Sequence, residues 1–187
     1  MNPQEKGRRR DEAILALVAK FGCLRRSQIQ AVAFSGRTAE RSCQRRLRSL
    51  VKRGKLNRER GPGEQYVYSV GNVGQREHRM AVADLYIRAV RERGPGERIE
   101  FQPEYPLSGQ DRSDGLLTWH TRDTTYLAFV EVQREGKARL GKYMRYLQSG
   151  QWQGAVFPRV VVVGQTGEAG RLTVREVKES VRKAVTG

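Results

Sequence analysis

The sequence predicts a mixed chain of the α+β or α/β class in two parts: three helices with a β-hairpin, then elements in the order α-β-β-β-α-β-α. In the first part, apolar residues recur every three or four positions, as on one face of a helix. From residue 98 onwards they alternate or form short runs, as in strands. The segment 71–75 contains two glycines and separates the parts, so the predicted domains are residues 1–71 and 76–187.

Three helices are expected before residue 54. Asp11 and Glu12 open the first, which carries an apolar stripe and ends at Gly22. Ser27 is the predicted cap of a short second helix, and Thr38 that of a third. A β-hairpin follows, with strands at 55–60 and 65–70 around a Gly-Pro-Gly turn. Three helices followed by a basic hairpin are typical of a winged helix-turn-helix domain.

The third helix has one apolar and one basic face. Between Thr38 and Arg53 there are six Lys or Arg residues and one acidic residue. Arginine suits bidentate contacts with phosphates and guanine edges in a DNA major groove. The predicted DNA-binding residues of this helix and the hairpin are Arg37, Arg41, Gln44, Arg45, Arg48, Lys52, Lys55, Arg58 and Arg60. The alternative is a winged helix used for protein contacts, whose charges only solvate its surface.

The charge balance agrees with a polyanionic partner. The 187 residues have a net charge of +16, and residues 1–71 hold 17 Lys and Arg against 6 Asp and Glu. Nucleic acid is the commonest partner of such proteins, here double-stranded DNA. Apolar runs are far shorter than the roughly 18 residues of a membrane span, so we expect a cytoplasmic protein without a membrane partner. Cys23 and Cys43 are expected to be buried thiols.

The second part is predicted to begin with a helix at 78–93 and strands near 99–101, 116–119 and 126–132. A helix at about 137–147 follows, with Leu140, Tyr143, Met144 and Leu147 on its apolar side. A buried strand at 160–163 and a final helix capped by Thr173 complete the order.

This order resembles the core of the PD-(D/E)xK phosphodiesterases. Their motif falls here on Asp114, Glu131 and Gln133, and alternate strand residues such as Glu131 and Gln133 face the same way. Asp114 and Glu131 are the predicted ligands of Mg²⁺ or Mn²⁺, which would activate a water for phosphodiester cleavage. The predicted accessory residues are Glu104, Lys137, Lys142 and Tyr146. In the alternative, Asp114 belongs to a turn and Glu131 is a partly exposed strand residue. No motif for an organic cofactor is found.

The two parts together resemble the replication-relaxation family. The resemblance uses His78 at a helix start, Glu104, Ser113-Asp114-Gly115, the segment 129–133, and Lys142 with Tyr146. The family pattern usually has Pro-Asp-Ala and Glu-x-Asp at the two acidic motifs, whereas this chain has Ser-Asp-Gly and Glu-x-Gln. The resemblance implies a protein of plasmids or other mobile elements that acts in replication, DNA relaxation or mobilisation, with proteins of those processes as further partners.

Two functions follow as expectations. The first is a double-stranded-DNA-binding protein whose nuclease-like domain cleaves DNA with a divalent metal. The alternative is a non-catalytic regulator or relaxosome accessory protein, whose nuclease-like domain only binds DNA or partner proteins. The sequence leaves open whether the chain is an enzyme.

Overall fold

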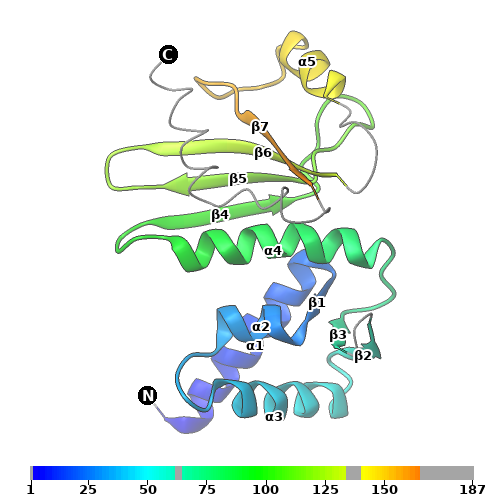
Figure 1. Cartoon of the computed structure of the whole chain (residues 1–187), viewed down its shortest axis with the longest axis vertical. Coiled ribbons are helices and arrows are strands. Elements are labelled where there is room, and N and C mark those ends of the chain that lie inside the picture. Colours follow the sequence, from blue (N-terminus) through cyan, green and yellow to red (C-terminus); the bar gives the residue numbers. More distant parts are fainter. Residues whose placement is uncertain (1, 62–64, 134–139, 165–187) are drawn as a thin grey trace. The chain divides into compact units, whose positions relative to one another are not determined.

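The computed structural model describes residues 2–61, 65–133 and 140–164. Over this part of the chain it is a mixed α+β structure with five helices and two sheets, as the sequence predicts at that level (Figure 1). The chain divides into two compact units, Met1–Ile87 and Arg88–Gly187. The predicted domains, 1–71 and 76–187, are segments expected to fold independently. The division into units does not test independent folding, so these domains stay predictions.

The first unit contains the three predicted helices and the hairpin. Its three-stranded sheet has the order β1-β3-β2, and both strand pairs are antiparallel. The elements in chain order are α1 (Pro3–Phe21), β1 (Cys23–Arg25), α2 (Arg26–Ala33), α3 (Ala39–Lys52), β2 (Asn57–Arg60) and β3 (Tyr66–Ser69), followed by α4 (Arg76–Glu92), within which the division falls.

Apolar helix faces and the sheet make the core of the first unit. Ile14, Val18 and Phe21 of the predicted stripe are buried, as are the residues of α3 that share one face, Cys43, Leu47 and Leu50. Cys23 and Cys43 are both buried and free, which confirms the prediction for the two thiols.

Two predicted helix starts are wrong. α1 begins at Pro3 because the Asn2 side chain accepts the Gln4 N–H, at 3.1 Å, and so caps it. Asp11 therefore lies inside the helix. α2 begins at Arg26 instead of after Ser27, because the Gln28 side chain accepts the N–H of Arg25 at 2.8 Å. Just before it, the short strand β1 was not predicted.

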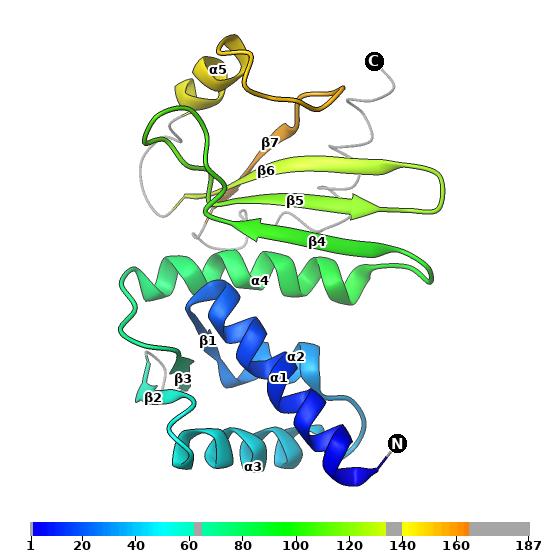
Figure 2. The ribbon, with the colours of Figure 1, turned by 180° about the vertical axis from the view of Figure 1, so that it is seen from behind.

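The second unit is built on a four-stranded sheet in the order β4-β5-β6-β7 (Figure 2). Its strands are antiparallel except β6 and β7, which are parallel. The elements are β4 (Arg98–Pro103), β5 (Gly115–His120), β6 (Thr125–Gln133), α5 (Gly141–Gln148) and β7 (Arg159–Gly164). The predicted order of helix, three strands, helix and strand is therefore confirmed. The final helix predicted from Thr173 lies outside the described residues.

Of the four residues on the predicted apolar side of α5, only Tyr143 is buried, so the prediction is wrong for the other three. The helix buries Tyr143 and Tyr146, whereas Leu140, Met144 and Leu147 are 44–55% exposed. Both tyrosine rings pack against Phe129, with centroid distances of 5.2 and 6.1 Å. Aromatic rings bury more area than leucine, so this cluster decides which face of α5 turns inward.

Candidate functional site

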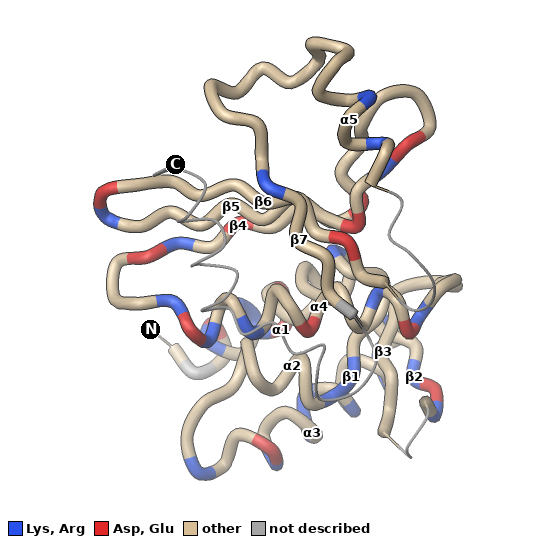
Figure 3. The backbone as a smooth tube through the Cα atoms, turned by 45° about the horizontal axis from the view of Figure 1, so that its top comes forward, with Lys and Arg blue, Asp and Glu red and all other residues tan. Residues whose placement is uncertain are grey.

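The basic face of α3 is exposed along its whole length. Arg41, Arg45, Arg48 and Lys52 follow one another at helical spacing, and all four are exposed. They lie on the side away from the buried residues Cys43, Leu47 and Leu50. We call these four residues the α3 basic stripe. Lys and Arg positions of the chain are coloured blue in Figure 3.

Other arginines of the first unit are engaged in ion pairs. Asp11 accepts from Arg46 Nε at 2.5 Å with one oxygen and from Arg53 at 2.6 Å with the other. Arg26 pairs with Glu40 at 3.1 Å. By contrast, Arg41, Arg45 and Arg48 pair with no carboxylate in the part of the chain that the structure describes. The charge of the α3 basic stripe is thus left for the solvent or for a partner.

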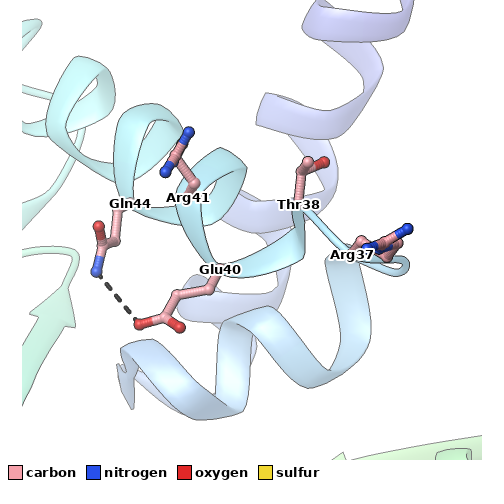
Figure 4. A pocket seen from close by; sticks show the side chains of 5 residues that line it. All are labelled: Arg37, Thr38, Glu40, Arg41 and Gln44. Atoms are coloured by element: carbon pink, nitrogen blue, oxygen red, sulfur yellow. Dashed lines mark hydrogen bonds between the residues drawn. The ribbon is translucent and has the colours of Figure 1, made fainter.

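A hollow opens at the start of α3 (Figure 4). It is lined by Arg37, Thr38, Glu40, Arg41 and Gln44. Gln44 donates to Glu40 at 3.5 Å, and Arg26 neutralises the same carboxylate. The hollow therefore keeps the positive charge of Arg37 and Arg41.

The hairpin adds further exposed cations. Lys55, Arg58 and Arg60 are exposed, and the Arg58 guanidinium stacks 4.5 Å from the centre of the Tyr66 ring. Glu59 lies between them in sequence, and its carboxylate is held by Arg76. With Arg37, Gln44 and the α3 basic stripe, all nine predicted DNA-binding residues are exposed or half-buried in the first unit.

The two predicted metal ligands lie at neighbouring strands of the second unit, one just before β5 and the other in β6. Asp114 directly precedes β5, and Glu131 belongs to β6, where Val130 pairs with Gly115. Asp114 Oδ2 accepts the backbone N–H of Val132 at 2.6 Å. This bond fixes the Asp114 carboxylate beside the strand that carries Glu131.

Glu131 is held by two consecutive residues of α5. Its Oε1 atom accepts from the Lys142 ammonium and from the Tyr143 hydroxyl. The side chains of Lys142 and Glu131 are only 15% and 14% exposed. Lys142 also donates to the backbone carbonyl of Arg112, at 2.5 Å. We call Asp114, Glu131, Lys142 and Tyr143 the carboxylate site.

The sequence analysis missed Tyr143 and the buried Ser113 as members of this region. The Tyr143 hydroxyl lies 3.0 Å from Ser113 Oγ, which itself donates to the Val130 carbonyl at 3.0 Å. Burial, and next the hydrogen bond to Glu131, raise the pKa of Tyr143 well above its ordinary value, so the residue stays a neutral donor. The only available signal was its position next to Lys142.

The remaining predicted residues are dispersed. Gln133 is half-buried at the end of β6, and Lys137 lies outside the described residues. Glu104 is exposed, with its carboxylate 4.0 Å from Arg112, and its backbone N–H donates to the Asp114 carbonyl at 3.0 Å. Tyr146 is buried against Phe129, and burial raises its pKa to about 12. It lies in the aromatic core of the unit.

As arranged, the carboxylate site does not fit a divalent metal. Among the described residues, no three His, Cys, Asp or Glu side chains are grouped as metal ligands. Mg²⁺ can use one or two carboxylates with waters, but those oxygens must be available. Here Oε1 of Glu131 already binds an ammonium and a hydroxyl, and Oδ2 of Asp114 binds an amide.

Comparison with known proteins finds a family match that covers most of the first unit and continues through β4. The family model described as Replication-relaxation matches residues 15–103. Residues 15–103 are therefore similar to the replication-relaxation family, which supports the resemblance stated from the sequence. The matched segment contains the α3 basic stripe and ends before Asp114 and Glu131. No curated protein and no solved structure matches this chain. Within the described residues, none of its helices is both long and apolar enough to cross a membrane.

Proposed function

We propose that this protein, whose residues 15–103 match the replication-relaxation family, binds double-stranded DNA through a winged-helix domain in its first unit. In this proposal α3 is the recognition helix and the β2–β3 hairpin is the wing. The observation that carries the proposal is the α3 basic stripe, whose arginines pair with no carboxylate among the described residues. The process served is replication, relaxation or mobilisation of a mobile element in the cytoplasm, with other proteins of that process as partners.

The stripe needs a partner because it does not help the helix to fold. Like charges spaced four residues apart destabilise a helix by about 0.2–0.5 kcal/mol per pair. Arg41 and Arg45 are such a pair, and so are Arg48 and Lys52. A duplex removes this repulsion, since its phosphates and guanine edges accept from guanidinium groups. An α-helix of about 10–12 Å diameter also matches the major groove, which is about 12 Å wide.

The hairpin extends the same basic surface. Lys55, Arg58 and Arg60 are exposed, as expected of a wing that contacts phosphates beside the groove. Stacking on Tyr66 restrains the Arg58 guanidinium, so less conformational entropy is lost when it binds a phosphate. The competing interpretation is a basic surface that binds an acidic protein.

The test is fluorescence anisotropy with a labelled duplex over a range of salt concentrations. We expect Arg45→Ala with Arg48→Ala to weaken binding and to reduce the slope of log K against log salt by up to about 1.8, since each phosphate contact that is lost contributes about 0.9. The matched control is Arg8→Ala with Arg9→Ala, two exposed arginines of α1 that pair with Glu12 and Glu5.

The control keeps the net charge equal to that of the test variant. Equal losses in the two double variants would mean that only overall charge matters. An unchanged affinity in the α3 variant at every salt concentration would refute the recognition-helix assignment. Tight binding to an acidic protein but not to the duplex would favour the competing interpretation.

Metal-dependent DNA cleavage is the second candidate function. It is favoured by the position of Asp114 and Glu131 at neighbouring strands. The pairing of Glu131 with Lys142 weighs against it, so we rank it below DNA binding without cleavage. Incubating supercoiled plasmid with Mg²⁺ or Mn²⁺ tests this ranking. Cutting by the wild type that is lost in Asp114→Ala would reverse it.

A further inference from the structure

We propose that Lys142 is a built-in cation of the carboxylate site. Its ammonium takes the place on Glu131 that a divalent metal ion would occupy, and removal of this one charge opens a site for such an ion at Asp114 and Glu131. The proposal concerns the second unit alone and does not depend on DNA binding by α3.

The contacts of Lys142 fix its ammonium in place. Nζ donates to Glu131 Oε1 and to the Arg112 carbonyl, two acceptors from different segments of the chain. The same nitrogen lies 5.3 Å from the centre of the Tyr143 ring. With only 15% of its side chain exposed, Lys142 differs from the solvated lysines that form weak surface ion pairs.

The charges around the site explain why a cation is needed. The Glu131 side chain is 14% exposed. The Asp114 carboxylate is held beside β6, the strand of Glu131, because it accepts the Val132 N–H. Two carboxylates removed from water are costly unless a positive charge compensates for them. At the third position of the nuclease-like motif this chain has Gln133, which is neutral. Lys142 supplies the positive charge from α5 instead.

A metal ion and Lys142 would compete for one carboxylate. The ammonium binds Oε1 of Glu131, and a divalent cation at either oxygen of that carboxylate would lie at repulsive distance from it. Tyr143 is no comparable obstacle, because its hydroxyl is neutral and a second carboxylate oxygen is present on Glu131. Without the ammonium, two carboxylates with water are a sufficient ligand set for Mn²⁺ or Mg²⁺.

The experiment is a titration of Mn²⁺ into the full chain. Calorimetry measures the heat of binding, and electron paramagnetic resonance measures the free Mn²⁺. The test variant is Lys142→Met, which keeps the length of the side chain and removes its charge. We expect it to bind one Mn²⁺ at least ~10-fold more tightly than the wild type. Adding Asp114→Asn to this variant should abolish the gain.

Arg145→Met is the matched control. Arg145 is also a cation of α5, but it pairs with Asp111 at 2.7 Å and not with Glu131. We expect this variant to bind Mn²⁺ as the wild type does. A similar gain in Arg145→Met would attribute the effect to general charge and would overturn the proposal.

Three further results would overturn it: Mn²⁺ affinity that is equal in wild type and Lys142→Met, a gain that survives Asp114→Asn, or tight wild-type binding that Asp114→Asn abolishes. Circular dichroism checks that each variant folds. If Lys142→Met does not fold, Lys142→Gln replaces it under the same criteria, since its amide can still donate to Glu131. None of these outcomes bears on the Arg45 and Arg48 measurements, so the two proposals fail separately.

Discussion

Asp11 connects α1 to the recognition helix proposed above, and its replacement by asparagine is the most direct test of how α3 is held. The carboxylate is buried, with 12% of its side chain exposed, and each of its oxygens receives one guanidinium from α3. Asparagine keeps the size of the side chain. However, it replaces one accepting oxygen with an NH₂ group that faces a donor.

The expected loss follows from the two bonds. A hydrogen bond to a charged group contributes about 1.5–3 kcal/mol. Arg46 is 33% exposed, so its bond keeps most of that value, whereas Arg53 is 51% exposed and its bond is screened by water. Together these give an expected decrease of about 2–3 kcal/mol in the free energy of unfolding.

Urea denaturation, followed by far-UV circular dichroism, measures this decrease. Glu12→Gln is the control, because Glu12 is the next residue of α1 but its ion pair is weak. Its side chain is 61% exposed, and its carboxylate lies 3.8 Å from the Arg8 guanidinium. We expect the control to change stability by less than about 0.5 kcal/mol. If Asp11→Asn lost no more than Glu12→Gln, the two bonds would not hold α3, and the reasoning would be refuted.

Three other predictions concern packing and ionisation. Gly115→Ala should destabilise the protein by about 1–3 kcal/mol in urea, since its Cβ would lie 2.1 Å from the Phe101 ring, whereas Gly74→Ala, with nothing within 4 Å, should not. Burial raises the pKa of the Cys43 thiol to about 11, so at pH 8 it should react with a thiol reagent only after denaturation; fast reaction of the native protein would contradict this. Folding raises the pKa of Tyr143. The contribution of this residue to the free energy of unfolding is therefore complete below its ordinary pKa of 10.0 and decreases as the pH rises above that value. Stability should therefore decline less between pH 9 and pH 11 in Tyr143→Phe, and an identical decline in both proteins would argue against the shift.

Elements with local signals could be predicted from the sequence. The third helix and the hairpin follow from apolar spacing and a Gly-rich turn, so α3, β2 and β3 appear where expected. β1 could not be foreseen, because three residues form a strand only when β3 lies beside them, with Cys23 opposite Ser69. The ion pairs of Asp11 could not be foreseen for the same reason, since its partners lie 35 and 42 residues away.

The candidate site shows the same limit at the level of chemistry. The predicted order of strands placed Asp114 near Glu131, and the structure has Asp114 directly before β5, the neighbour of β6, but that order could not show what else contacts the two residues. The apolar spacing put Leu140, Tyr143, Met144 and Leu147 on one side, but in the structure only Tyr143 of these four is buried. Tyr143 can pack its ring on Phe129 and donate its hydroxyl to Glu131, and both gains depend on tertiary structure.

The geometry of the α3 basic stripe limits the kind of polyanion that would suit it. From Arg41 to Lys52 it covers twelve residues, and the eleven steps between them span about 16 Å at 1.5 Å per residue. A major groove is about 12 Å wide, so a helix lying in it would bring the stripe's ends near the flanking phosphates and its middle near base edges. Under the proposed function, Arg41 and Lys52 therefore determine affinity, whereas Arg45 and Arg48 also determine sequence preference. An acidic protein would compensate the same charge but gives no reason for this division between the ends and the middle.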